Sequence, residues 1–287
     1  MASSAAPTAL LFPGQGSQTS EMAGVAAAHR PDLLERASAE LGADPFERLG
    51  DGTRFAQAAI YCASLAHWKR AGSPACEMVA GHSLGELAAL VAGGALGAEE
   101  GLRLAVVRGR LMDEACEAKP GAMLAVLGGG AEVAELAARL GLAVANDNAP
   151  GQVVLSGEAE AISEARRQLR ADGLKAIRLP VSGAFHSPLM APAAERFREA
   201  LERAELGEPE RPVYSCTAAA PFDDVRARLA AALTEPVLWR ATLARMRDDG
   251  AATFLETGPG DVLTGLVRRT LPEAQARSLA DAEAVGA

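Results

Sequence analysis

Short apolar runs alternate with helix-period segments in the first part of the chain. Residues 9–12 form an apolar run that Pro13-Gly14 closes, and residues 78–80 form another that ends at Gly81, so we expect two buried strands. Apolar residues recur at helical spacing before and after the second run. The predicted helices cover residues 31–41, 55–70, 84–95 and 98–115.

The middle of the chain has a different order of elements. The pattern predicts a strand, a helix, two strands, a helix and a strand, at residues 122–127, 131–140, 142–146, 153–156, 159–171 and 174–181. Gly173 follows the second helix, where glycine commonly ends a helix. A β-α-β-β-α-β order is typical of a ferredoxin-like unit, so we expect a small inserted subdomain at residues 122–181.

The rest of the chain returns to the first pattern. Helices are predicted at residues 188–206, 223–233, 237–250 and 261–270, and strands at residues 213–216 and 253–255. Strands that alternate with helices indicate a mainly parallel sheet. We therefore expect a large α/β subdomain built from residues 1–121 and 182–287.

Composition narrows the function classes. The 287 residues are 49% hydrophobic and 23% charged, as in globular proteins, and 37 acidic against 28 basic residues give a net charge of −9. That charge argues against a nucleic-acid partner, and no apolar run is long enough for a membrane span. The first basic residue is Arg30, so no secretory signal is predicted. The four cysteines lack metal-ligand spacing, and we expect no metal and a cytoplasmic location.

A serine stands where a strand turns into a helix. Gly81-His82-Ser83-Leu84-Gly85 fits G-x-S-x-G, and the flanking glycines permit the sharp turn that exposes a nucleophilic hydroxyl. The amides at the start of the following helix favour a developing oxyanion. We expect the neighbouring His82 to pack or hydrogen-bond within this turn.

A serine nucleophile needs a base, and the chain holds four histidines. His29 and His67 lie in helical stretches and are expected at the surface. His186 lies in a loop between a strand and a helix, where sites collect in open α/β sheets, so it is the predicted base. No acid stands out as a third member, and a backbone carbonyl could orient the imidazole instead.

Two further features could serve the reaction. Gly14-Gln15-Gly16 follows the first strand, but no third glycine completes a dinucleotide fingerprint, so the loop is either a tight turn or a second oxyanion donor. Arg108 interrupts an apolar helix face, and Gly109 leaves room beside it. An inward arginine needs a carboxylate, which is either an internal Asp or Glu or part of the substrate.

Four segments together resemble one family. FPGQGSQ (12–18), GHSLGE (81–86), GAFHS (183–187) and ETGPG (256–260) occur in this order, and the resemblance extends from about Leu10 to about Leu271. The chain resembles the malonyl-CoA:acyl carrier protein transacylases of fatty-acid and polyketide synthesis. That resemblance implies an α/β-hydrolase-like large subdomain, a ferredoxin-like small subdomain and a monomer. Malonate decarboxylase systems use a similar transacylase, so the pathway stays open.

The resemblance also implies roles for the matching residues. Ser83 takes the malonyl group and His186 is general base, then general acid. The remaining implied assignments are the oxyanion amides of Gln15 and Leu84, the substrate-binding residues Arg108, Gln57, His82, Asn146 and Phe185, and a histidine-orienting carbonyl at Ala232. Phe185 resembles the malonyl-selective members, because a bulky ring would crowd a methylmalonyl branch.

The predicted reaction is ping-pong transfer from malonyl-CoA to the thiol of an acyl carrier protein, a transient partner, without a cofactor. Carrier proteins are acidic, so docking needs a basic patch. Candidates are Arg166, Arg167, Arg170, Lys175 and Arg178, or Arg268 and Arg269, although each also fits a solvated helix face. The alternatives are an acyl-carrier editing hydrolase or thioesterase with the same Ser83 and His186, and a non-catalytic docking module.

Overall fold

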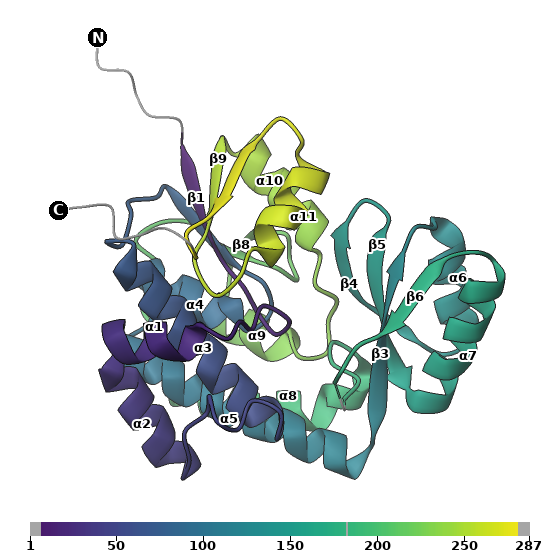
Figure 1. The fold of residues 1–287 in the computed structure, drawn as a ribbon, viewed down its shortest axis with the longest axis horizontal. Coiled ribbons are helices and arrows are strands. Elements are labelled where there is room, and N and C mark those ends of the chain that lie inside the picture. The colour runs from purple at the N-terminus through teal and green to yellow at the C-terminus, as the bar shows by residue number, and fades with distance from the viewer. Residues whose placement is uncertain (1–6, 182, 281–287) are drawn as a thin grey trace.

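Two sheets organise the chain. The computed structural model describes residues 7–181 and 183–280, and Figure 1 shows a large sheet covered by helices beside a smaller sheet with helices of its own. The predicted fold class, an α/β-hydrolase-like large subdomain with an inserted ferredoxin-like small subdomain, is confirmed.

The large sheet is mainly parallel. Its strands are β1 (Thr8–Phe12), β2 (Met78–Gly81), β7 (Val213–Ser215), β8 (Ala220–Pro221), β9 (Thr253–Glu256) and β10 (Gln275–Ser278). They follow the order β10-β9-β1-β2-β7-β8, and only β7 and β8 pair antiparallel. The carboxyl ends of the central strands β1 and β2 therefore meet at one edge of the sheet.

Helices bury both faces of this sheet. Leu10 and Phe12 of β1 belong to one apolar core, and Ala9 and Leu11 belong to another, because successive side chains of a strand point to opposite faces. A strand that is buried on both faces has a continuous apolar sequence, and for this reason β1 could be predicted from the sequence.

One face of the large sheet carries most of the helices. These are α1 (Met22–His29), α2 (Pro31–Leu41), α3 (Thr53–Arg70), α4 (Gly85–Ala92), α5 (Ala98–Ala118), α8 (Ala191–Glu202) and α9 (Val225–Ala231). The other face is covered by α10 (Trp239–Asp248) and α11 (Val262–Thr270). In Figure 1 the first group of helices lies on one side of the sheet and the second group on the other.

The small subdomain is an antiparallel sheet with two helices. Its elements are β3 (Gly121–Leu127), α6 (Ala131–Arg139), β4 (Ala143–Ala149), β5 (Gln152–Glu158), α7 (Ala159–Ala171) and β6 (Lys175–Arg178). The strand order β4-β5-β3-β6 places β4 and β6 at the sheet edges and β3 and β5 in the centre. Apolar residues of both helices, such as Leu136 and Ile162, pack on the sheet and form a separate core.

A backbone seam joins β4 to the large subdomain. The Val237 N–H donates to the Ala145 carbonyl, and the Asp147 N–H donates to the Val237 carbonyl, both at 2.8 Å. Arg240 forms a salt bridge with Asp147 at 2.7 Å beside these bonds. The edge of the small sheet is therefore held directly against the segment that leads into α10.

Some elements differ from the predicted ones. The sequence pattern missed α1, which is rich in alanine, and the edge strands β8 and β10, which lack an apolar run. The helix predicted at residues 188–206 is a 3₁₀ turn at Pro188–Met190 followed by α8, which ends at Glu202. Leu206 instead forms an isolated β-bridge with Leu96.

Candidate active site

Ser83 occupies a strained turn between β2 and α4. Its φ of 52° lies in the left-handed region, which non-glycine residues rarely adopt. A Cβ on Gly81 would overlap the backbone of Gly85 and Glu86, and a Cβ on Gly85 would overlap the Phe12 carbonyl. The two glycines are therefore needed for the turn that presents the Ser83 hydroxyl at the carboxyl end of β2.

His186 lies within hydrogen-bond distance of the serine. Its Nε2 is 2.9 Å from Ser83 Oγ, and its Nδ1 is 3.1 Å from the Glu235 carbonyl oxygen. A carbonyl only accepts, so Nδ1 carries the proton and Nε2 accepts from the serine hydroxyl. Burial, with the nearby charge of Arg108, lowers the pKa of His186 to about 3. The imidazole is thus neutral and able to take a proton.

The orienting carbonyl differs from the predicted one. The alignment pointed to Ala232, but the hydrogen bond goes to Glu235. The N–H groups of Thr234 and Glu235 both donate to the Ala231 carbonyl, and this turn after α9 carries the Glu235 carbonyl to the imidazole. The Ala232 carbonyl also raises the pKa of His186, as the smaller of the two backbone contributions.

Arg108 points inward from α5 to the serine. It is 4% exposed, its Nη1 donates to Gln57 Oε1 at 2.9 Å, and its Nη2 donates to Ser83 Oγ at 3.1 Å. It forms no salt bridge with a carboxylate in the described part of the chain. Burial accordingly lowers the pKa of Arg108 to about 10. The sequence left open whether Arg108 pairs with an internal Asp or Glu or with a carboxylate of the substrate. Among the described residues, no internal Asp or Glu forms a salt bridge with it.

The room beside Gly109 serves another purpose than expected. A Cβ there would meet the Cα of Arg54 at 2.6 Å, so the glycine admits the backbone of α3. This close approach of α3 to α5 brings the Gln57 amide beside Arg108. Asp113 of α5 strengthens the contact by accepting from the amides of Thr53 and Arg54, at 2.8 and 3.0 Å.

Glu86 is a charged residue that sequence reasoning missed. It is 1% exposed behind the turn, and its carboxylate accepts from the Cys216 N–H at 2.8 Å. Burial raises the pKa of Glu86 to about 7, although the Cys216 amide and the Arg108 charge act in the opposite direction. The only hint in the sequence was its place in the GHSLGE segment.

The two residues whose amides are expected to bind an oxyanion line the same groove. Leu84 is the residue immediately before α4, and Gln15 follows β1 in the glycine loop. Neither N–H donates to an acceptor among residues 7–181 and 183–280. Amides without a partner at a helix start and in a glycine loop are available as hydrogen-bond donors, so the oxyanion role stays a prediction for Gln15 and Leu84.

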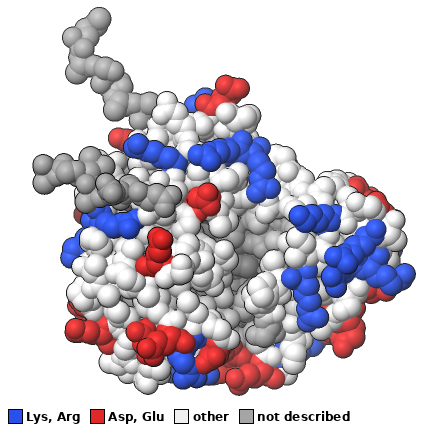
Figure 2. Space-filling model, viewed as in Figure 1, with Lys and Arg blue, Asp and Glu red and all other residues white. Residues whose placement is uncertain are grey.

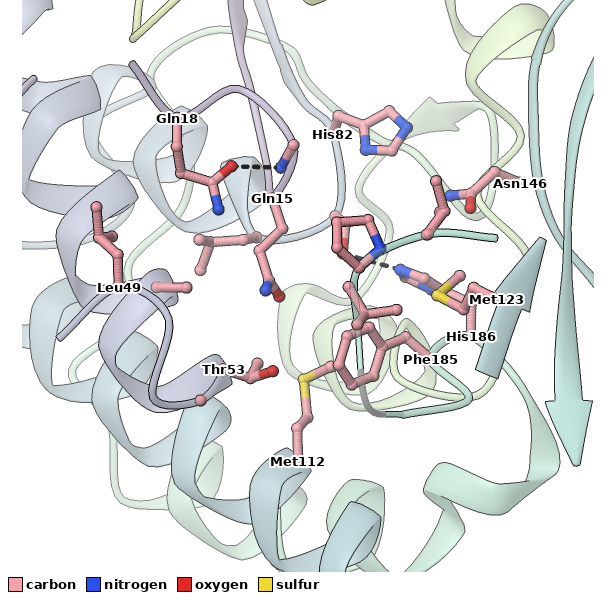
Figure 3. A pocket seen from close by; sticks show the side chains of 18 of the residues that line it. Gln15, Gln18, Leu49, Thr53, His82, Met112, Met123, Asn146, Phe185 and His186 are labelled. Carbon is pink, nitrogen blue, oxygen red and sulfur yellow. Dashed lines mark hydrogen bonds between the residues drawn. The ribbon is translucent and has the colours of Figure 1, made fainter. Parts of the chain in front are cut away.

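A groove of about 780 Å³ opens onto these groups. Figure 3 shows Gln15, His82, Asn146, Phe185 and His186 around it, and all five residues line the groove. Gln57, which is fully buried, lies behind the wall together with Arg108. The predicted substrate-binding residues thus form a lining and a layer beneath it.

His82 links the serine turn to the small subdomain. Its Nε2 is 2.9 Å from Asn148 Oδ1, and its ring packs edge-on against Trp239 at 5.3 Å between centroids. His82 thus packs and hydrogen-bonds as expected, but its partners lie in β4 and α10, and Asn148 is the residue that holds its ring. Asn148 lies at an irregularity of β4, where the strand register with β5 shifts, a feature that can re-aim side chains toward a site.

The prediction for His67 was wrong. It is 3% exposed, and burial lowers its pKa to about 4, because α3 is covered on nearly all sides. His67 Nδ1 lies 3.2 Å from Arg70 Nη2. The structure thus leaves His186 as the histidine bonded to Ser83.

The described residues contain neither a cluster of metal ligands nor a membrane-spanning helix. No three His, Cys, Asp or Glu side chains there lie together as a metal site would need. No described helix combines the length and hydropathy of a membrane span. All four cysteines are free thiols.

The fold and site define a class of protein. A serine on a strand–turn–helix, bonded to a neutral histidine beside an unpaired arginine, is typical of enzymes that transfer anionic acyl groups. Residues 47–287 match the model of the acyl transferase domain, and the chain belongs to this family.

Named relatives share most of this chain. It is 37% identical to the malonyl CoA-acyl carrier protein transacylase of Escherichia coli K12 over 97% of both chains. It is 41% identical, over 92% of its length, to the polyketide biosynthesis protein ThaF of Burkholderia thailandensis, of which it spans only 24%.

Solved structures agree. The malonyl-CoA:acyl carrier protein transacylase of Xanthomonas oryzae pv. oryzae has a TM-score of 0.89 at 35% identity, covering 97% of this chain and 96% of that one. A malonyl-transacylase in complex with a type II polyketide acyl-carrier protein has a TM-score of 0.87 at 34% identity, covering 95% of each chain.

Proposed function

We propose that the protein transfers a malonyl group from malonyl-CoA to the thiol of an acyl carrier protein through an ester on Ser83. The observation that carries this proposal is the buried, unpaired guanidinium of Arg108, 3.1 Å from Ser83 Oγ. A buried guanidinium that forms no salt bridge with a described carboxylate, although the charge of Glu86 acts on it, favours an acyl group that brings its own carboxylate to the nucleophile. Relatives named as malonyl transacylases support the same substrate.

In the first half-reaction, His186 Nε2 takes the Ser83 proton as Oγ attacks the thioester carbonyl. The amides of Gln15 and Leu84 stabilise the oxyanion, and Arg108 holds the free carboxylate of malonate. The carbon–sulfur bond then breaks, and the departing thiolate takes the proton from His186. The Glu235 carbonyl stabilises the imidazolium that exists between these steps.

The second half-reaction is the reverse with another thiol. The carrier's phosphopantetheine thiol gives its proton to His186 and attacks the Ser83 ester. The ester bond breaks, and Oγ regains the proton. His82, Asn146 and Phe185 shape the groove that admits both thiol arms, and the Phe185 ring would disfavour a methyl branch.

The carrier would dock at the mouth of the groove. Figure 2 shows Lys and Arg side chains gathered on the face of the small subdomain, and Arg178 of β6 both belongs to the predicted basic patch and lines the groove. Arg167 is paired with Glu164, which makes it a weaker candidate than Lys175 and Arg178. An acidic carrier fits this side of an otherwise acidic protein.

We further infer the organisation of the catalytic unit. Residues 1–121 and 182–287 form the large subdomain and residues 122–181 the small one, with the groove between them. Residue 182 and both ends of the chain lie outside the described residues. One chain supplies every site group above, which supports a monomer working without a cofactor. Four free thiols favour a reducing compartment such as the cytoplasm.

The test is the mass of the intact protein after brief exposure to malonyl-CoA. We expect a gain of one malonyl group, absent in Ser83→Ala, that a holo-carrier protein discharges. The Ser187→Ala variant, which lacks a nearby buried hydroxyl bonded to Ala184, is the matched control and should still be acylated. Release of coenzyme A and free malonate without transfer would indicate a hydrolase, and no reaction would refute the proposal.

A further inference from the structure

The Gln57 amide beside Arg108 is fully buried and has two polar contacts. Its Oε1 accepts from Arg108 Nη1 at 2.9 Å, and its Nε2 donates to Met112 Sδ at 3.1 Å. Met112 lies one helical turn after Arg108 on α5, and it lines the groove next to Phe185, as Figure 3 shows. A single amide therefore connects the arginine to a methionine of the groove wall.

The chemistry of the three groups fixes the orientation of that amide. A guanidinium has only N–H donors, so the amide must turn its oxygen toward Arg108. Its NH₂ group then points to the opposite side, where the Met112 sulfur is the acceptor found within the described residues. Thioether sulfur is a weak acceptor, yet without it a buried NH₂ donor would lose this partner.

We infer that Met112 is a positioning and selectivity-determining residue, whose sulfur holds Gln57 so that Arg108 is set for a carboxylate. This inference rests on the proposed function, because it assumes that Arg108 binds the malonyl carboxylate. A Gln57 amide that loses its second contact is free to rotate or withdraw, and Arg108 then loses its fixed partner. An acyl group with a carboxylate would be affected, and an acetyl group would not.

The chain offers a matched set of variants. Met112→Leu keeps volume and removes the acceptor, and Met112→Gln restores an oxygen acceptor on a side chain of similar length. Met246→Leu is the control, because Met246 is as deeply buried as Met112 but lies in the core on the other face of the large sheet, away from the groove and Gln57. Thermal melting of all three variants verifies that each is folded.

The readout is the ratio of malonyl to acetyl acylation rates at Ser83, with kcat and KM measured separately. In Met112→Leu we expect this ratio to fall roughly 3- to 10-fold, mainly through a higher KM for malonyl-CoA. A fall of this size corresponds to the loss of one modest hydrogen bond. Met246→Leu should retain the wild-type ratio, and Met112→Gln should recover it to within about 2-fold.

Three results would overturn the inference. These are an unchanged ratio in Met112→Leu, an equal fall in Met246→Leu, and a Met112→Gln variant that stays as low as Met112→Leu. Failure of the proposed function gives a different result, because the wild-type protein itself would then not be acylated by malonyl-CoA.

Discussion

Replacement of Arg108 by alanine tests the electrostatics of the site. The change removes the donors to Gln57 and Ser83 and the positive charge at a position that is 4% exposed. The carboxylate of a bound malonyl group would then lose its hydration on entering the site and find no partner there. An acetyl group has no carboxylate, so its binding would lose nothing of this kind.

The size of the expected loss in malonyl transfer follows from the burial of Arg108 and its malonyl carboxylate partner. Removing one partner of a buried, hydrogen-bonded charge pair costs about 3–5 kcal/mol. The groove gives water some access to the carboxylate, so we take the lower end, about 3 kcal/mol, or roughly 150-fold in rate. Protein stability should change less, because Arg108 forms no salt bridge with a described residue and is itself desolvated.

Single-turnover acylation of Ser83 by malonyl-CoA and by acetyl-CoA measures the effect. We expect the malonyl rate of Arg108→Ala to fall by about two orders of magnitude, with the acetyl rate unchanged or higher. Arg110→Ala is the control, because Arg110 lies on the same helix with a side chain 55% exposed beside Glu114. A malonyl-to-acetyl ratio equal to that of the wild type would refute the role assigned to Arg108.

Three further predictions concern the pH dependence of acylation, the pH dependence of stability, and helix capping. Because burial holds the pKa of His186 near 3 instead of 6.5, the acylation rate should not fall between about pH 7.5 and 5.5, and a stopped-flow pH profile that followed an ordinary histidine would contradict this. The same lowered pKa means that the stability contributed by neutral His186 is complete above pH 6.5 and is lost as the pH falls toward 3. Asp113→Ala leaves the Thr53 and Arg54 amides without their acceptor, so we expect the free energy of unfolding to fall by about 1–2 kcal/mol, measured by urea unfolding. Asp113→Asn keeps one oxygen and should lose less. Equal losses in the two variants would count against the capping role.

The parts of the site that depend on local backbone geometry could be predicted from the sequence. Ser83 stands between glycines that the turn requires, and the order of the elements around it identified the strand and helix. The small subdomain was predictable for the same reason, since its core residues recur with helical and strand periods. In both cases neighbours in the sequence are also neighbours in space.

Groups that meet across the fold could not be predicted in this way. Asn148 reaches His82 only because β4 docks at Val237, and Glu86 accepts from Cys216, which is 130 positions away in the chain. The carbonyl that orients His186 depends on how the turn after α9 closes, so a motif alignment was three residues off. The surface prediction for His67 failed because helical period alone does not show that a helix is buried on all sides.

An anionic acyl group would change the electrostatics around His186. Burial is the main cause of the lowered pKa of His186, and the positive charge of Arg108 is the second. A malonyl carboxylate that neutralises Arg108 would remove that second contribution and make His186 a stronger base at the moment when it must accept the Ser83 proton. Acetyl-CoA brings no such charge, so it would meet a less basic histidine as well as an unpaired arginine. The loss of Arg108 should relieve His186 for any acyl group, which is why the acetyl rate of Arg108→Ala is expected to hold or rise while the malonyl rate falls.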